Sequence, residues 1–212
     1  MSVAPTLGVY KLPTIDNEPM RNYEPNSKDR QELQKAVDEL LACKPFEIPV
    51  IIDGQEFRSG KLAKQVNPGD HAQAVCYYHE ADERMVNIAI EGALKAKKQW
   101  MNMPWSERAA ISMKAADLIA HKYRYQLLAA TMVGQGKNVW QAEIDAGAEI
   151  CDFLRFGVKY VDDMYQIQPP RNSPGVWNRT EYRPLEGFVL AISPFNFTAI
   201  AGNLVMTPAM VG

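Results

Sequence analysis

The sequence predicts an α/β fold in which a mainly helical N-terminal region with β-hairpins leads into the first strand, loop and helix of a parallel sheet. Three observations predict this fold. Apolar residues recur at helical spacing over 27–43 and again over 82–165. Alternating segments with turn residues lie between these stretches, over 49–78. The run Phe188–Ile192 is continuously apolar, as is typical of a strand buried on both faces, and a loop and another helix follow it.

Composition is that of a globular protein and argues against several other classes. Of 212 residues, 47% are hydrophobic and 23% are charged, and the formal net charge of −2 comes without a basic stripe. We therefore expect no nucleic-acid partner. No apolar run approaches the roughly 20 residues that a membrane-spanning helix needs. Cys43, Cys76 and Cys151 are odd in number and unpaired in spacing, which argues against a disulfide framework and a structural metal site.

We divide the chain into an extended arm over 1–26, a helical and hairpin region over 27–186, and the start of a ligand-binding region over 187–212. The arm is rich in proline and lacks the apolar core of a secretory signal and the Arg-rich pattern of a good mitochondrial presequence. Targeting therefore cannot be read from it.

The first elements after the arm follow from caps and turns. Ser27 is suited to cap a helix that runs to Cys43. Asp53-Gly54 predicts a two-residue hairpin turn. A second strand pair is expected at 64–66 and 74–78.

Four helices are expected over 82–165. Asp82 caps the first, which Pro104 stops, and Ser106 caps the second. Gly134 ends the third, as glycine often does just past a helix. The fourth helix runs from Asn138 to Tyr165, with a buried stripe of Trp140, Ile144, Ala148, Cys151 and Leu154.

The last part of the chain changes character. A proline-rich connection over 169–175 is followed by an exposed strand at 177–182, the buried strand at 188–192, a loop at 193–198 and a helix from Ala199. This order places a ligand at the carboxyl end of a parallel strand. Because a parallel strand needs a crossover and a partner, we expect the sequence to be a piece of a longer protein.

Two polar motifs have ordinary structural explanations. Gly134-Gln-Gly-Lys137 has the look of a phosphate loop, but Asn138 stands where a Ser or Thr is needed, so we favour a helix end and turn. The fourth helix carries four carboxylates, which could do acid–base chemistry. A solvated helix face is the favoured interpretation of Glu143, Asp145, Glu149 and Asp152.

Asn196 supports two interpretations. It follows the predicted strand and stands between Phe195 and Phe197, so its amide could donate to a developing oxyanion. It could equally cap the following helix or satisfy a turn. The residues by themselves leave both open.

A resemblance to a known family favours the interpretation in which the Asn196 amide donates to an oxyanion. The segment 186–200, EGFVLAISPFNFTAI, resembles the strand and active-site loop of aldehyde dehydrogenases of the glutamate-semialdehyde (Δ1-pyrroline-5-carboxylate) type. TMVGQGK at 131–137, QAEID at 141–145 and FLRF at 153–156 are similar to the same subfamily, and the likeness covers most of the chain. It implies an aldehyde dehydrogenase-like fold in which 187–212 begins a Rossmann-like NAD-binding domain.

The resemblance implies NAD-dependent oxidation of L-glutamate 5-semialdehyde to L-glutamate in proline breakdown. In this family a cysteine thiolate attacks the aldehyde, hydride passes to NAD⁺, and a glutamate-activated water hydrolyses the thioester. A homo-oligomer in the mitochondrial matrix is implied as well. Two alternatives stay open: a dehydrogenase for another aldehyde, and a shortened, non-catalytic isoform that binds a partner or modulates an oligomer.

The resemblance also assigns residues. Asn196 matches the oxyanion-holding asparagine; Glu149 matches, less specifically, an acidic residue near the substrate entrance. The loop at the nicotinamide end of NAD is matched by Ile192, Ser193, Pro194 and Phe195. The family's cysteine and general-base glutamate are expected beyond Gly212, and no cysteine here matches the motif. We therefore expect this chain alone to oxidise no aldehyde.

Overall fold

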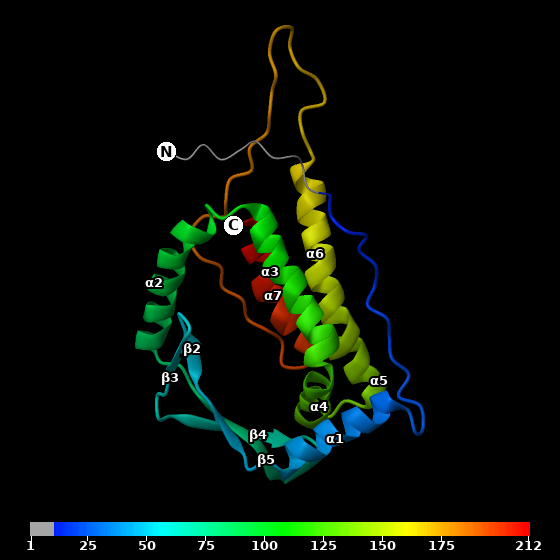
Figure 1. Cartoon of the computed structure of the whole chain (residues 1–212). Coiled ribbons are helices and arrows are strands. Elements are labelled where there is room, and N and C mark those ends of the chain that lie inside the picture. Colours follow the sequence, from blue (N-terminus) through cyan, green and yellow to red (C-terminus); the bar gives the residue numbers. More distant parts are fainter. Residues whose placement is uncertain (1–10) are drawn as a thin grey trace.

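The structure is a computed structural model that describes residues 11–212; the first ten residues of the predicted arm lie outside it. Helices dominate, as expected, and α3, α6 and α7 pack side by side with α4 at one end of this bundle (Figure 1). The helices are α1 (Lys28–Ala42), α2 (Glu83–Trp100), α3 (Trp105–Asp117), α4 (Arg124–Gln135), α5 (Val139–Ala142), α6 (Ile150–Tyr165) and α7 (Thr198–Val211).

Small residues bring the helices close together. Ala116 and Ala120 pack with Cys151 and Ala199, so that α3, α6 and α7 share one core. A second cluster joins Leu33 of α1 to α4, and a third joins α3 to α6 and to the far end of α7. These contacts fix α7, which begins directly after the predicted loop, against the rest of the helical region.

The strands form two small sheets. One is the hairpin of β2 (Val50–Ile52) and β3 (Gln55–Phe57), and its turn residues Asp53 and Gly54 have φ of 51° and 72°. The predicted Asp-Gly turn is therefore confirmed. The other has the order β1-β5-β4, in which β1 runs parallel and β4 antiparallel to the middle strand. Its strands are β1 (Phe46–Ile48), β4 (Leu62–Asn67) and β5 (Asp70–His79).

Most of the predicted helix ends are confirmed. Ser27 and Asp82 accept hydrogen bonds from the first turns of α1 and α2. Ser106 was wrongly predicted as a cap, because α3 already begins at Trp105. Gly134 was also wrongly placed: it lies inside α4, and the left-handed residue that ends the helix is Gly136, with φ of 66°.

Asn138 starts the fourth predicted helix with a reciprocal pair of bonds. Its side chain accepts from the Gln141 backbone N–H, and the Gln141 side chain accepts from the Asn138 N–H. We expect Asn138→Ala to lower the free energy of unfolding by about 1 kcal/mol. Urea denaturation measures this, and Asn138→Asp, which keeps the acceptor, is expected to lose less.

The fourth helix contains a π-helical segment, η2 (Glu143–Glu149), between α5 and α6. A π turn holds more residues than an α turn, so it shifts which side chains face the core. The predicted stripe is therefore wrong at its start, where Trp140 and Ile144 are exposed, and right from Ala148 onward. A second π segment, η1 (Leu118–Lys122), extends α3.

The two predicted strands near the end of the chain are absent from the described structure. Residues 177–182 and 188–192 have no strand pairing, and most of their side chains are exposed. Backbone groups in a strand must bond to a neighbouring strand, and neither segment has one among residues 11–212. Residues 166–183 instead form a projecting loop beyond the end of α6 (Figure 1). The boundaries at 26/27 and 186/187 stay predictions.

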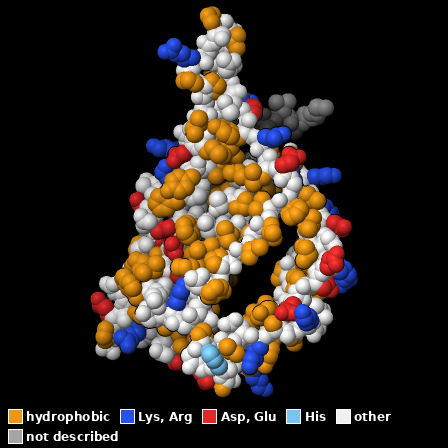
Figure 2. All heavy atoms as spheres, turned by 180° about the vertical axis from the view of Figure 1, so that it is seen from behind, with side chains coloured by type: hydrophobic (Ala, Val, Ile, Leu, Met, Phe, Trp, Pro, Cys, Tyr) orange, Lys and Arg blue, Asp and Glu red, His pale blue; other side chains and the backbone are white. Residues whose placement is uncertain are grey.

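Hydrophobic side chains gather on the face opposite the one in Figure 1, over its upper and central parts (Figure 2). Leu190, Ile192 and Val205 are among the exposed apolar residues of the chain. Within 11–212 no helix is long and apolar enough to cross a membrane, and no three His, Cys, Asp or Glu side chains are placed to hold a metal ion.

Candidate functional site

The candidate site is the loop that precedes α7. Asn196 is exposed there, and Phe195 beside it is 93% exposed. The alternative in which Asn196 caps the following helix is wrong: the N-cap is Phe197, which supplies no side-chain bond. The amide of Asn196 is therefore not used by the helix that follows it.

Asp145 caps α7 in place of a local residue. Its Oδ2 accepts from the Thr198 backbone N–H at 3.0 Å, and its Oδ1 accepts from the Ala199 N–H at 2.7 Å. These are first-turn groups that lack partners within their own helix. The carboxylate also lies at the positive end of the helix dipole, where negative charge is favoured.

Lys137 completes this arrangement. Its Nζ donates to Asp145 Oδ2 at 2.7 Å and to the Asn196 backbone carbonyl at 2.7 Å. The same ammonium lies 4.3 Å from the centre of the Phe197 ring. The motif at 134–137 is thus a helix end and turn, as favoured from the sequence, and its lysine contacts the candidate loop.

The four carboxylates of the fourth helix do not form a solvated face, and that prediction is wrong. Glu143 and Asp145 are buried, and Glu149 and Asp152 are half-buried. Burial raises the pKa of Glu149, with a further rise from the nearby Asp145 carboxylate. The π turn explains the change, because it rotates residues 143 and 145 toward the core.

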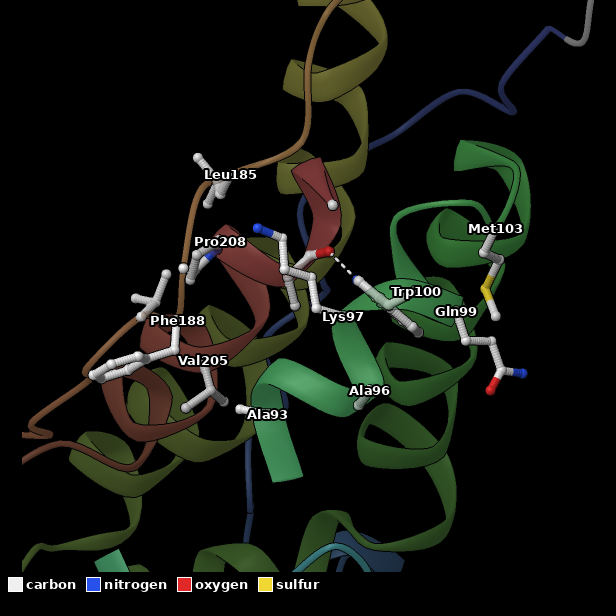
Figure 3. A pocket seen from close by; sticks show the side chains of 14 residues that line it. Ala93, Ala96, Lys97, Gln99, Trp100, Met103, Leu185, Phe188, Val205 and Pro208 are labelled. Carbon is white, nitrogen blue, oxygen red and sulfur yellow. Dashed lines mark hydrogen bonds between the residues drawn. The ribbon is translucent and has the colours of Figure 1, made fainter. Parts of the chain in front are cut away.

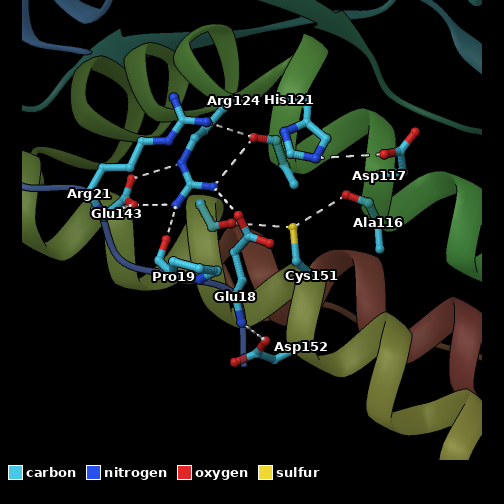
Figure 4. Close-up of polar contacts among 12 residues, drawn as sticks. Glu18, Pro19, Arg21, Ala116, Asp117, His121, Arg124, Glu143, Cys151 and Asp152 are labelled. Atoms are coloured by element: carbon cyan, nitrogen blue, oxygen red, sulfur yellow. Dashed lines mark hydrogen bonds and ion pairs between the residues drawn. The ribbon is translucent and has the colours of Figure 1, made fainter. Parts of the chain in front are cut away.

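Glu143 belongs to a buried ion network that fastens the arm to the helices (Figure 4). Arg124 bonds to Glu143 and, at 2.7 Å, to Glu18 of the arm. Arg155 reaches the other oxygen of Glu18 at 2.6 Å, and Asp152 accepts the Glu18 backbone N–H at 2.6 Å. The arm is therefore held at Glu18 by charged side chains of α4 and α6.

The cysteines in this chain are packing or surface residues. Burial raises the pKa of Cys76, and burial raises the pKa of Cys151 to about 12. The Cys151 thiol donates to the carbonyls of Ala116 and Gly147. A nucleophilic cysteine needs an accessible thiolate, so neither buried thiol is suited to that role.

A cavity with mainly apolar walls lies away from Asn196. It has a volume of about 480 Å³ and lies between α2, the segment 185–189 and the C-terminal half of α7. Figure 3 shows Trp100 at its edge, with the indole N–H donating to the Ala209 carbonyl at 2.6 Å. A second cavity, of about 300 Å³, does touch the candidate loop, at Phe195 and Thr198.

Comparison with known proteins identifies the family. The model of the aldehyde dehydrogenase family matches residues 55–212. The chain belongs to this family. A delta-1-pyrroline-5-carboxylate dehydrogenase of Agaricus bisporus is 59% identical over 206 residues, which are 97% of this chain and 38% of that protein. The mitochondrial enzyme of the same name from Homo sapiens is 46% identical over 198 residues, 93% of this chain and 35% of its own length.

Solved structures agree with the fold. The delta-pyrroline-5-carboxylate dehydrogenase of Mycobacterium tuberculosis, bound with NAD, is 42% identical with a TM-score of 0.93. The match covers 97% of this chain and 38% of that one. The predicted aldehyde dehydrogenase-like fold is confirmed, and this chain spans little more than a third of the relatives it matches.

The residues that hold the loop were not identified from the sequence. Asp145, Lys137, Thr131 and Gln135 all bond to residues 196–199. No spacing pattern connects positions so far apart along the chain. The one available signal was a carboxylate among apolar neighbours on a helix, where an unpaired charge is costly.

Proposed function

We propose that the protein to which this chain belongs carries out the NAD-dependent oxidation of L-glutamate 5-semialdehyde, formed from Δ1-pyrroline-5-carboxylate, to L-glutamate. The observation that carries this proposal is the exposed Asn196 amide, on a loop whose backbone is held at the Asn196 carbonyl and at the N–H groups of Thr198 and Ala199. The relatives that bear the name delta-1-pyrroline-5-carboxylate dehydrogenase support the substrate.

The loop residues fit the apolar end of NAD. Ile192 and Phe195 are 79% and 93% exposed, so they offer apolar surface on which a nicotinamide ring could pack together with Ser193 and Pro194. They do not fit the diphosphate, because Asp145 already occupies the first N–H groups of α7. When bound, NAD⁺ would supply the hydride acceptor.

Asn196 has the chemistry for the carbonyl oxygen of the substrate. Its amide N–H₂ would donate to that oxygen as negative charge develops on it. Glu149, whose carboxyl has a raised pKa because of burial, is proposed to lie near the substrate entrance. Both assignments follow the family pattern.

We also propose a homo-oligomer located in mitochondria. Several relatives carry the word mitochondrial in their names. The projecting loop over 166–183 supports assembly, because it exposes Ile167, Val176 and Trp177 at its surface. Such exposed apolar residues are commonly covered by another subunit.

The substrate is tested by comparing aldehydes with the full-length protein. We expect kcat/KM for glutamate semialdehyde to exceed that for a simple aliphatic aldehyde of equal length by about 100-fold or more, because a site built for polar groups rejects analogues that leave them unpaired. NADH formation measures this. Equal kcat/KM values would favour a dehydrogenase for another aldehyde.

A further inference from the structure

Two charged residues outside the proposed reaction hold the candidate loop from a different part of the chain. Asp145 belongs to η2 and Lys137 to the turn before α5, yet both bond to residues 196–199. We propose that Asp145 and Lys137 are positioning residues that aim the Asn196 amide at the reacting carbonyl. This inference rests on the proposed function, since it assigns a purpose to the same loop.

The bonds hold the backbone on the C-terminal side of Asn196. Lys137 fixes the Asn196 carbonyl, and its ammonium faces the Phe197 ring. Asp145 fixes the N–H groups of Thr198 and Ala199. The Thr198 hydroxyl is held too, at 2.8 Å from the Thr131 hydroxyl and 3.1 Å from Gln135 Nε2. Among residues 11–212 no hydrogen-bond partner holds the side-chain amide of Asn196, while its backbone carbonyl is fixed.

The strength of the arrangement comes from burial. The Asp145 side chain is 2% exposed and that of Lys137 is 16% exposed. Hydrogen bonds from charged groups in such surroundings are short and strong. A shift of about 1 Å in a catalytic group can cost roughly 100-fold in rate. An ion pair that sets the position of the loop can therefore control turnover without touching the substrate.

Neutralising Asp145 is the sharpest test. In Asp145→Asn one acceptor oxygen becomes a donor N–H₂, which must face Lys137 or a backbone N–H. We expect kcat of the full-length protein to fall about 30-fold, with little change in KM, because the binding surfaces stay in place. Asp152→Asn is the matched control, since Asp152 lies on the same helical stretch and accepts a backbone N–H of the arm. Its kcat is expected to stay within about threefold of the wild type.

Lys137 provides a second variant that leaves the cap of α7 intact. Lys137→Met removes the bond to the Asn196 carbonyl, and we expect about a tenfold lower kcat. Lys137→Arg keeps a donor and a positive charge, so it is expected to restore most of that loss. An equal loss of kcat in Lys137→Met and Lys137→Arg would overturn the role proposed for the positive charge.

A double-mutant cycle separates positioning from general stability. In an Asn196→Ala background Asp145→Asn should lower kcat by less than threefold, because its effect acts through an amide that is no longer present. A further 30-fold loss in that background would overturn the proposal. Amide hydrogen exchange at Thr198 and Ala199 gives a readout independent of turnover, and it should be at least tenfold faster in Asp145→Asn.

The outcomes distinguish this inference from the proposed function. If Asn196→Ala retains full activity while Asp145→Asn frees both amides, the loop is positioned but the oxyanion role of Asn196 is wrong. If Asp145→Asn changes neither hydrogen exchange nor kcat, the positioning role is wrong whatever the reaction.

Discussion

Replacing Arg124 with Met is expected to destabilise the folded protein by about 3–5 kcal/mol, which is the usual cost of removing one partner from a buried ion pair. The Arg124 side chain is fully buried and bonds to Glu143, which is also fully buried, and to Glu18 of the arm. Burial lowers the pKa of Arg124, but the bonds from Glu143 and Glu18 outweigh burial and raise it overall. Both carboxylates would lose an arginine partner together.

The remaining partners of Glu143 and Glu18 limit the loss of stability in Arg124→Met but do not prevent it. Glu143 keeps the Arg21 backbone N–H at 2.8 Å and the Tyr23 hydroxyl at 2.6 Å, and Glu18 keeps Arg155. Gly147 lies against this network, because a Cβ there would come within 2.7 Å of a Glu143 oxygen. Little space is therefore available for the carboxylate to move toward a new donor.

Thermal unfolding and limited proteolysis of the arm measure the effect. Arg58→Met is the matched control, because Arg58 pairs with Glu47 and Glu56 at the surface, where solvent screens a salt bridge and it contributes little to stability. Adding Glu143→Leu to Arg124→Met should recover part of the loss. Equal destabilisation by Arg58→Met and Arg124→Met would contradict the importance of burial.

Lowering the pH should reduce the difference in free energy of unfolding between the wild type and Arg124→Met. Burial raises the pKa of Glu18, but Arg155 and Arg124 outweigh burial and lower it below its ordinary value of 4.5. A lowered pKa means that Glu18 stabilises the fold above pH 4.5 and that this contribution is lost as the pH falls through its folded pKa. The variant, with one arginine fewer, has less of this contribution to lose.

Local chemistry made much of the fold predictable. Ser27, Asp82 and the Asp53-Gly54 turn act through neighbours within a few residues, so their roles follow from sequence spacing. The predicted strand at 188–192 was wrong for the opposite reason. An apolar run forms a buried strand only when partner strands pair with it, and none does among residues 11–212. Ser106 failed because Pro104, two residues earlier, already stands at the start of the helix.

The candidate site was predictable as a segment but not as a structure. The loop around Asn196 was located from the apolar run before it, whereas the roles of its residues came from a resemblance and stay predictions. The role of Asp145 in holding this loop was not predicted. Asp145 bonds to Thr198 across 53 positions of the chain, and the π-helical segment turns its side chain toward the core. Helical periodicity of 3.6 residues places that carboxylate wrongly. Long-range bonds of this kind follow from packing and not from any local pattern.

Replacing Asn196 with Ala is expected to lower kcat of the full-length protein about 100- to 1,000-fold, because one oxyanion-hole donor contributes roughly 2.7–4 kcal/mol to transition-state stabilisation. The amide is exposed and takes no part in capping α7, so its removal should leave stability nearly unchanged. An interaction made only in the transition state lowers kcat and kcat/KM by the same factor. KM is therefore expected to stay within about threefold of the wild type.

Steady-state kinetics with glutamate semialdehyde measure these values, and thermal unfolding checks stability in parallel. Asn102→Ala is the matched control, because Asn102 is an exposed asparagine whose amide donates to the Lys98 carbonyl at the end of α2. Its kcat should match the wild type. If Asn196→Ala instead raised KM with kcat unchanged, the amide would bind substrate and transition state equally, and the oxyanion role would be wrong. Asn196→Asp separates geometry from donation, since it keeps the shape of the side chain, replaces the donor with a negative charge and is expected to be at least as slow as the alanine variant.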